Sequence, residues 1–338
     1  MRVSTSFLYQ RELGNITQRQ QDLSKTSMQA STMKRVVVPS DDPVASARAL
    51  EVQQSKDLNT RYKENGTKVN ESLNLADSCM SDVTGVLQRV KELVVAAGSP
   101  ALNDANLKAM AGEIRTQYAQ LFATANKKDG TGEYIFAGGQ GKMQPFVENT
   151  GVGTNYGSEE NISYVGDTTQ RTMQITSSRY MAMSETGDNI FVDVKGADSD
   201  PNSVSMFKTL NDLVVALEKG RGSNEFKVQI GGGSTESSNP ADGSTTSVNK
   251  LGVGLQRLDS AINNISTIRA SIGSRMREVE ASQEVADTLD LHYSTQLQDL
   301  QDADYPKILS DLSLQRTLLD AAYAAFQKVQ GANLFQYL

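Results

Sequence analysis

The chain of 338 residues contains no tryptophan, one cysteine (Cys79) and one histidine (His292). A single cysteine forms no intrachain disulfide, and one cysteine with one histidine cannot supply the ligands of the usual zinc sites. A Ser-His or Cys-His catalytic pair would have to use His292. These absences exclude a disulfide-stabilised fold and the usual zinc sites, and they leave His292 as the one histidine that nucleophilic catalysis could use.

Long hydrophobic runs are also absent. The longest, residues 321–326, has six residues, whereas a helix that spans a membrane needs about 20. The first 30 residues contain no apolar run longer than 7–9, so we expect no cleavable secretion signal. The sequence therefore predicts no membrane insertion, and either a cytoplasmic protein or one exported without such a signal.

The charge balance is acidic, because 33 basic and 40 acidic residues give a formal charge of −7. This argues against a dedicated nucleic-acid-binding protein, which usually has a basic face. Only 38% of the residues are hydrophobic. The chain length suggests two or three domains, and the modest apolar fraction limits the core that they can share.

Glycine is concentrated in the middle of the chain, where residues 130–254 hold 19 of the 26 glycines. Short strand-like segments occur there, at 161–165 and 172–183, and residues 134–139 are expected to form a short strand that runs into a turn. One helix should begin at a Ser203 cap and end at Gly220. The composition of 231–247 is almost entirely polar and glycine-rich, so a mobile loop is expected across 221–247.

The two flanks have helical periodicity instead. Apolar and small residues recur at steps of three and four in the first 40 residues, including Leu13, Ile16, Leu23 and Ala30. A matching pattern near the other end includes Leu297, Leu300, Ile308, Leu312, Leu319, Phe326 and Val329. We predict that these residues form the assembly seam of two paired coiled-coil helices.

Two long helices are expected inside these terminal segments. Asp42 followed by Pro43 is a favourable start for a helix, and its buried side should include Leu50, Leu58, Leu73, Ala76, Met80, Val83, Leu87, Val90 and Val94. The other long helix has apolar residues about every 3.5 positions over 251–279. Pro306 should interrupt the helical pattern that follows, so the helix is expected to restart there.

The two ends carry opposite charge. Residues 1–35 have a net charge of +4 and residues 287–338 have a net charge of −4. Exposed ion pairs contribute only about 0–1 kcal/mol each, so charge is expected to select the partner and register while apolar burial holds the pair together. Such thin paired helices have a low core fraction, which is typical of a subunit that becomes ordered on assembly.

The fold class expected from these patterns is mainly α, with paired terminal coiled-coil helices, a long helical rod domain and an inserted β-rich outer domain. We find no catalytic, cofactor or metal motif. Residues 138–143 lack the serine or threonine and the first glycine of a phosphate-binding loop. Asp299, Asp302 and Asp304 are expected on a solvated helix face, and Cys79 is expected in the core.

Ser-Asp-Asp-Pro-Val-Ala-Ser-Ala-Arg-Ala-Leu at 40–50 is similar to the segment after the first helix in the flagellin superfamily, and most closely resembles that of its hook–filament junction members. Asp-Ala-Asp-Tyr at 302–305 and the ending Asn-Leu-Phe-Gln-Tyr-Leu at 333–338 resemble the C-terminal helix and tail of the hook-associated protein 3 type. Gly-Glu-Tyr-Ile-Phe-Ala-Gly at 132–138 matches a turn-and-strand motif of the same group.

This resemblance implies three domains. Residues 1–40 with 297–338 would form the terminal helical assembly domain, and residues 41–140 with 248–296 the helical rod domain. Residues 141–247 would form the β-rich outer domain.

The resemblance also implies a structural junction protein outside the cell, exported through the flagellar type III channel. Its partners would be further copies of itself in a ring or helical assembly, the first hook–filament junction protein, flagellin and an export chaperone. No cofactor, nucleic acid or membrane insertion is implied.

Two alternatives remain at this point. A filament flagellin has the same terminal helices, and an intracellular helical scaffold would need no export. An enzyme is the least favoured class. Acidic residues are plentiful, but nothing in the sequence singles out a catalytic pair among them.

Overall fold

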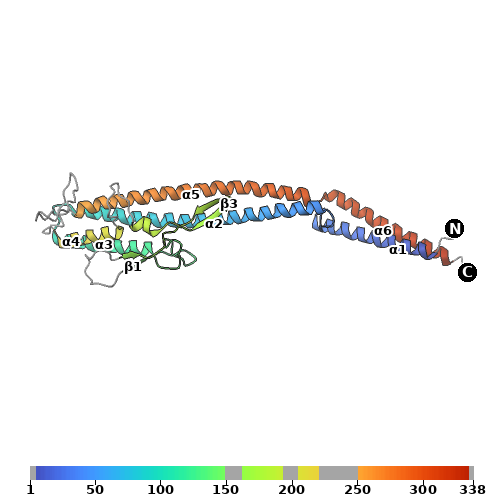
Figure 1. Cartoon of the computed structure of the whole chain (residues 1–338), viewed down its shortest axis with the longest axis horizontal. Helices are drawn as coiled ribbons and strands as arrows, with labels where there is room; N and C mark the ends of the chain where they lie inside the picture. The colour runs from blue at the N-terminus through green and yellow to red at the C-terminus, as the bar shows by residue number, and fades with distance from the viewer. Residues whose placement is uncertain (1–4, 149–161, 193–204, 221–249, 335–338) are drawn as a thin grey trace. The chain divides into compact units, whose positions relative to one another are not determined.

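The computed structural model describes residues 5–148, 162–192, 205–220 and 250–334. The chain divides into two compact units. Unit 1 comprises Met1–Arg61 with Val285–Leu338, and unit 2 comprises Tyr62–Glu284. Long helices dominate both units, as Figure 1 shows, and two of these helices contribute residues to each unit.

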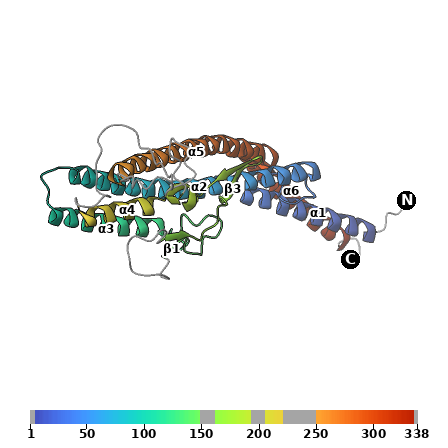
Figure 2. The same ribbon diagram turned by 60° about the vertical axis from the view of Figure 1, so that its left-hand side comes forward.

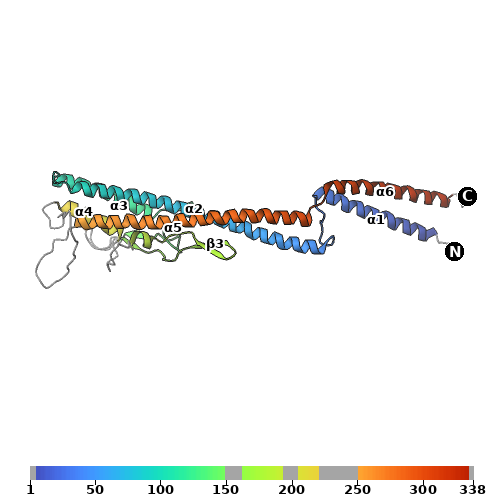
Figure 3. The same ribbon diagram turned by 90° about the horizontal axis from the view of Figure 1, so that it is seen from above.

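Unit 1 is built from two helical segments that are far apart in the sequence. Helix α1 (Thr5–Thr32) and helix α6 (Tyr305–Leu334) lie side by side and run antiparallel (Figure 3). The beginning of α2 (Pro43–Ala97) and the end of α5 (Lys250–Gln301) complete the unit. The predicted mainly α fold with paired terminal helices is confirmed.

The helix boundaries of unit 1 follow local chemistry. The backbone N–H of Ala45 donates to Asp42 Oδ1 at 3.0 Å, so the predicted cap at the start of α2 is confirmed. Helix α5 ends at Gln301 and α6 begins at Tyr305, one residue before Pro306. The proline therefore lies in the first turn of α6, where its missing N–H costs no hydrogen bond.

The buried side of α2 agrees with the prediction only in unit 2. Its predicted residues from Leu73 to Val94 are buried there, whereas Leu50 is 61% exposed and Leu58 is 48% exposed. The prediction for Leu50 and Leu58 is wrong because small and polar neighbours occupy the inner face in unit 1. Ala49, one residue before Leu50, and Asn59, one residue after Leu58, are buried instead.

Helix α5 repeats its buried positions every seven residues. Leu251, Leu258, Ile265, Ile272 and Val279 are all buried. Intervening residues such as Leu255 and Ile262 are half-buried against the same core. The predicted periodicity of this helix is confirmed, and it supplies one wall of unit 2.

Two shorter helices cover the same core and lie side by side in Figures 1 and 2. They are α3 (Asp104–Ala125) and α4 (Met206–Lys219). The hydroxyl of Ser205 caps α4, and Gly220 ends it with a φ of 70°. The end at Gly220 is confirmed, but the predicted Ser203 cap is wrong by two residues; Ser203 itself lies outside the described residues.

The strands of unit 2 form two small antiparallel sheets. Strand β1 (Phe146–Glu148) pairs with β2 (Ile162–Tyr164). Strand β3 (Thr172–Thr176) pairs with β4 (Arg179–Ala182), with a register shift between Gln174 and Thr176. The predicted loop 221–247 lies outside the described residues, and the three-domain division stays a prediction.

The segment 134–139 forms turns with only isolated bridges, from Lys128 to Tyr134 and from Ala137 to Thr186. The turn expected at its end is therefore confirmed, but the short strand expected before that turn is not formed. Gly138 interrupts any extended path, because its φ of 65° is left-handed. The turn brings the Gly138 backbone against the carbonyl oxygen of Asp167, where a Cβ atom would lie 2.0 Å from that oxygen.

An aromatic cluster closes the core of unit 2 where the strands meet the helices. Phe191, from the short π-helical turn η1 (Asp188–Val192), has ring centroids 5.4 Å from Phe136 and 5.2 Å from Phe146. Phe146 also contacts Phe207 of α4 at 5.4 Å. All four rings are at most 3% exposed, so this cluster ties the sheets to the helices by apolar burial.

Candidate assembly interface in unit 1

The predicted seam between α1 and α6 has a narrow buried line. Ile16 and Ile308 are each 7% exposed. The half-buried members are Leu23, Ala30, Leu312, Leu319 and Phe326, together with Leu297 and Leu300, which lie on α5 and not on α6. Leu13 is 40% exposed, and the side chain of Val329 is outside the described part. The structure brings the two segments together, while the role of these residues in assembly stays a prediction.

A side-chain hydrogen bond also crosses this helix pair. The Nε2 atom of Gln20 on α1 donates to the hydroxyl of Tyr323 on α6 at 2.6 Å. Both side chains are exposed, so the bond sits at the edge of the seam and contributes little to stability. The α1–α6 pair is therefore held mainly by a thin apolar contact.

The segment between α1 and α2, residues 33–42, is called the connector below. Its backbone is bonded to the break between α5 and α6. The Arg35 N–H donates to the Gln301 carbonyl at 2.7 Å, and the Ala303 N–H donates to the Met33 carbonyl at 3.1 Å. Both breaks in unit 1 thus lie at one level and are joined by backbone hydrogen bonds.

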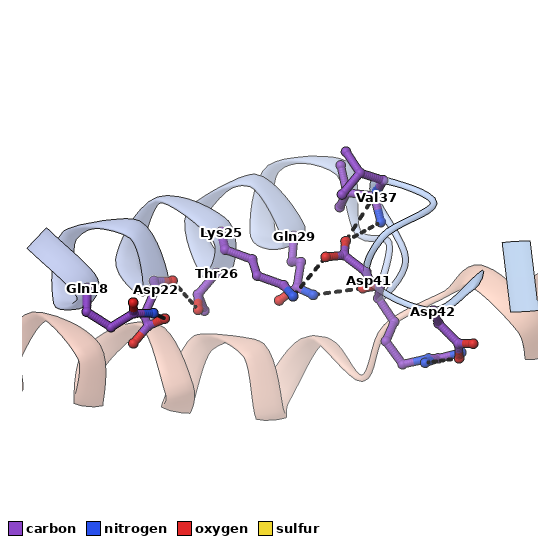
Figure 4. Close-up of polar contacts among 10 residues, drawn as sticks. Gln18, Asp22, Lys25, Thr26, Gln29, Val37, Asp41 and Asp42 are labelled. Atoms are coloured by element: carbon purple, nitrogen blue, oxygen red, sulfur yellow. Dashed lines mark hydrogen bonds and ion pairs between the residues drawn. The ribbon is translucent and has the colours of Figure 1, made fainter. Parts of the chain in front are cut away.

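Asp41 organises the connector from within, as Figure 4 shows. One carboxylate oxygen accepts the backbone N–H groups of Val37 and Val38, each at 3.2 Å. The other is 2.8 Å from the ammonium of Lys25 on α1. A single carboxylate therefore closes the connector on itself and ties it to α1.

Asp42 makes the second set of contacts at this level. Besides capping α2, its Oδ2 atom is 3.1 Å from the guanidinium of Arg35. The same guanidinium donates to the carbonyl of Leu300 at 3.0 Å, and Gln29 Nε2 donates to the Arg35 carbonyl at 2.7 Å. Arg35 consequently joins α5, the connector and the first turn of α2.

These contacts lower the pKa of both carboxyl groups. The hydrogen bond from Lys25 is the main cause for the lowered pKa of Asp41. For Asp42 the main cause is the backbone N–H of Ala45, followed by Arg35. Both groups are therefore held in the charged form that the connector needs.

Met33 begins the connector in a left-handed conformation, with a φ of 56°. A non-glycine residue in this region carries a strain of about 1–3 kcal/mol. Its side chain is 60% exposed, so no burial within the described chain offsets that strain. The conformation ends α1 and turns the chain toward residue 303.

The other part of unit 1 is held by polar contacts between α2 and α5. Asn59 is 6% exposed, and its Nδ2 atom donates to the carbonyl of Ala286 at 2.7 Å. Lys56 donates to Ser294 Oγ at 2.8 Å. The inner face between these polar contacts and the connector is lined by the small residues Ala45 and Ala49.

Large hydrophobic side chains are exposed mainly in unit 1. Twenty such residues are exposed among the described residues, and fifteen of them belong to unit 1. They include Phe7, Met28 and Val44 on the N-terminal segment and Val285, Leu291, Leu309 and Leu314 on the C-terminal one. A unit with so many uncovered apolar side chains has the character of an interface.

Within the described ranges, the histidine and the cysteine are not gathered into a reactive site. His292 is exposed and contacts Gln296, 3.0 Å away on the same helix. Cys79 is buried as predicted, and this burial raises the pKa of its thiol. Among the described residues, no group of His, Cys, Asp or Glu side chains is placed to hold a metal ion, and no helix combines the length and apolar character needed to cross a membrane.

One prediction about acidic residues is wrong. Asp299 is exposed on α5, but Asp302 and Asp304 lie in the break between α5 and α6 and not on a helix face. Asp304 instead caps α6, since its Oδ1 atom accepts the backbone N–H of Lys307 at 3.3 Å.

The contacts of Lys25, Arg35 and Asp41 were not predicted from the sequence. The charges of the two ends predict that the basic end meets the acidic end, but Lys25 and Arg35 pair with aspartates of their own end. No regular spacing signals these pairs, because they depend on how the connector folds. The Asp41-Asp42 dipeptide was the available signal, and only its helix-capping half was used.

Comparison with known proteins identifies the family. A model of the bacterial flagellin N-terminal helical region matches residues 3–140, and one of the C-terminal helical region matches residues 255–338. The chain is 31% identical to flagellar hook-associated protein 3 of Escherichia coli (strain K12) and 30% identical to that of Salmonella typhimurium (strain LT2), each over 99% of both chains.

Solved structures share the fold at lower sequence identity. A structure of a putative flagellar hook-associated protein from Vibrio parahaemolyticus has a TM-score of 0.61 at 15% identity, covering 78% of this chain and 100% of that one. The flagellar junction protein FlgL from Legionella pneumophila has a TM-score of 0.54 at 18% identity, covering 75% and 100%. The chain therefore belongs to the flagellin superfamily, as a member of its hook-associated protein 3 type.

Proposed function

We propose that this chain is a structural junction protein of the bacterial flagellum, which assembles between the hook side and the flagellin filament. The observation that carries the proposal is the match to hook-associated protein 3 over nearly the whole length of both chains. The paired terminal helices and their exposed apolar residues supply the surface through which such a protein assembles.

The physical argument rests on what unit 1 leaves uncovered. Six hydrophobic residues of unit 1 are buried among the described residues, whereas fifteen large ones are exposed. Apolar surface contributes roughly 25 cal/mol per Å² when it is removed from water. Covering these side chains with neighbouring subunits offsets the entropy lost when thin helices become ordered.

The finer parts of the proposal concern partners and location. We infer that the neighbours are further copies of this chain, the first junction protein and flagellin, and that an export chaperone binds the chain before assembly. The protein then works outside the cell, as part of the flagellum. Its role is mechanical, and the proposal assigns it no catalysed reaction.

The seam residues are part of the same proposal. We propose that Ile16, Leu23, Ile308 and their half-buried neighbours order α1 against α6 when the subunit is incorporated. Deleting residues 320–338 should then leave a folded unit 2 in a chain that cannot build the junction. If motility and filament attachment survived this deletion, the proposed role of the terminal pair would be wrong.

Deleting the gene separates the junction role from the two alternatives. A strain without the junction protein should release unpolymerised flagellin into the medium, whereas a strain without its flagellin releases none. A helical scaffold inside the cell predicts no effect on flagellin and no protein in sheared flagella. Detection of the chain in sheared flagella would exclude that scaffold.

A matched pair of surface variants tests the exposed apolar residues directly. Leu314→Ser removes a side chain that is 54% exposed in unit 1, and Val95→Ser removes one that is 58% exposed in unit 2. Both should leave the stability of the free chain nearly unchanged. Only Leu314→Ser should reduce incorporation into flagella, measured by quantitative immunoblotting of sheared filaments.

A further inference from the structure

The apolar core of unit 2 does not reach the point where α2 enters the unit and α5 leaves it. The buried hydrophobic residues nearest to that point are Val69 on α2 and Val279 on α5. Among residues 62–68 and 280–284, which continue the two helices from there, Gly66 is the one buried residue. Apolar burial therefore does not hold α2 against α5 over this stretch.

The apolar contacts of α5 also specify its register only weakly. Its buried positions repeat every seven residues, from Leu251 to Val279, so a shift along the helix presents the same kind of side chain to the core again. Directional polar contacts lack this ambiguity, and a single buried polar residue fixes the register of some coiled coils. The register of α2 and α5 is therefore expected to depend on polar contacts with fixed partners.

The hairpin formed by β3 and β4 supplies such partners to α2, and Figure 2 shows β3 beside this helix. Asn65 Nδ2 donates to the carbonyl oxygen of Gln174 on β3 at 2.8 Å. Ser72 Oγ donates to the carbonyl oxygen of Met183, directly after β4, also at 2.8 Å. Because Asn65 and Ser72 are seven residues apart, one face of α2 is bonded to the hairpin backbone at two levels.

The same hairpin is anchored to α5 mainly by charge. The hydrogen bond from Arg275 Nη1 to the Ala182 carbonyl is long, at 3.4 Å. The bond from Ser282 Oγ to the Ile175 carbonyl is also long, at 3.5 Å. The closer contact is the ion pair of Arg275 with Glu185, whose side chains are 17% and 5% exposed. A pair this well covered is screened by salt far less than an exposed one.

Glu185 also connects this anchor to the chain on the other side of the hairpin. Its second carboxylate oxygen accepts a hydrogen bond from Gln170 Nε2 at 2.9 Å. Beside it, Ser184 Oγ accepts the backbone N–H of Arg171 at 3.0 Å. These contacts join the segment before β3 to the segment after β4, so the anchor on α5 holds both strands of the hairpin.

We propose that the β3–β4 hairpin is a tie between α2 and α5, which fixes the axial register of the two helices where the apolar core ends. Asn65 and Ser72 fasten the hairpin to α2, and the Arg275–Glu185 pair fastens it to α5. Ile175, at 3% exposed, keeps the hairpin packed on the core, so the tie is stiff. The tie belongs to the free chain and does not depend on the proposed function.

Hydrogen exchange of the isolated full chain tests the fastening to α2. The double variant Asn65→Ala, Ser72→Ala removes both bonds to the hairpin. Alanine favours a helix more than asparagine or serine does, so α2 itself is not weakened. The amides of β3 and β4 should exchange about three to ten times faster than in the parent, because the strands lose their link to α2.

Asn74→Ala, Thr84→Ala is the matched control. It makes the same kind of change on the same helix, but the side chains of Asn74 and Thr84 donate to carbonyl groups within α2. The exchange of β3 and β4 should match the parent in this variant. Equal exchange of the strands in the two double variants, whether faster than in the parent or unchanged, would overturn the tie.

Spin labels at Glu71→Cys on α2 and Glu280→Cys on α5, both exposed positions, measure the register of the helices. The buried Cys79 stays unlabelled. The distribution of distances between the labels should be narrow in the parent, and broader or split in the variant that lacks both bonds to the hairpin. Asp77→Asn weakens the direct ion pair of α2 with Arg269 on α5 and should leave the distribution narrow. An unchanged distribution in the first variant, or equal broadening in Asp77→Asn, would overturn the proposal.

Discussion

Unit 1 and unit 2 are both built from long helices, but they bury their hydrophobic residues to very different extents. Among the described residues, 38 hydrophobic residues are buried in unit 2 and six in unit 1. Exposed large hydrophobic residues show the reverse, five against fifteen. Unit 2 completes its own core, whereas unit 1 leaves most of its large hydrophobic residues exposed, as the proposed contacts with other subunits require.

The polar contacts of the two units differ in the same sense. In unit 2, Arg269 of α5 forms two hydrogen bonds with the carboxylate of Asp77 on α2, at 2.7 and 3.1 Å, beside a continuous core. In unit 1, where few hydrophobic residues are buried, the ion pairs of Lys25 and Arg35 hold the connector instead. Ion pairs supplement burial in the first case and substitute for it in the second.

The test of this contrast with the largest expected effect removes one aromatic ring from the core of unit 2. Phe191→Ala leaves a cavity between Phe136, Phe146 and Phe207, and should lower the free energy of unfolding by about 3–5 kcal/mol. Leu23→Ala in the half-buried seam of unit 1 should cost less than about 1 kcal/mol in the free chain. Urea unfolding of both variants measures the difference, and comparable losses would contradict the contrast.

A second test concerns the turn that carries the strands of unit 2. Gly138→Ala forces a side chain into a left-handed conformation and against the Asp167 carbonyl, so we expect a loss of about 2–4 kcal/mol. The nearby hydroxyl of Tyr164 lies 2.8 Å from the same carbonyl, and its burial raises the pKa of Tyr164 to about 12. A shift of that carbonyl therefore disturbs a second, partly buried contact.

Gly112→Ala is the control for this substitution. Gly112 lies inside α3 with no atom within 4 Å of the added Cβ, so alanine should raise stability by up to about 1 kcal/mol. Opposite signs for the two variants in thermal unfolding support the turn. A neutral Gly138→Ala would show that the turn is not under constraint.

Periodicity explains why much of the fold was predictable. The heptad positions of α5, from Leu251 to Val279, and the cap at Asp42 depend on neighbours within a few residues in the sequence. The pairing of the two ends was predicted from their opposite charge together with an apolar stripe at each end. Such local patterns are strong wherever one face of a long helix is buried.

The wrong predictions concern positions whose structure depends on contacts with residues far away in the sequence. Leu50 and Leu58 fit the apolar period of α2. In unit 1, however, the buried side of this helix is formed by Ala45, Ala49 and Asn59, and the two leucines are exposed. The segment 134–139 has β-favouring residues, but the approach of Asp167 makes it a turn. The contact between Lys25 and Asp41 was missed for the same reason, because the two side chains meet only through the fold of the connector.

A third test addresses a buried polar contact within unit 1. Asn59→Ala removes the hydrogen bond to the Ala286 carbonyl and should destabilise this part of α2 and α5 by about 1–2 kcal/mol. Hydrogen exchange over residues 55–61 and 284–290 measures the loss. Asn74→Ala, which removes only an exposed bond within α2, should leave these segments unchanged, and equal effects would contradict the role of Asn59.

The smallest expected effect is the response of the connector to acid. Because Lys25 and the amides of Val37 and Val38 lower the pKa of Asp41 in the folded chain, this carboxylate stabilises the fold above its unfolded pKa of about 3.9. That stabilisation is present at neutral pH and is lost as the pH falls below about 4 and through the folded pKa. Carbon-13 NMR of the aspartate carboxyl groups should show Asp41 titrating below its ordinary range, and Lys25→Met should raise its pKa. An unchanged titration in Lys25→Met would mean that Asp41 is held by the backbone N–H groups of Val37 and Val38 alone.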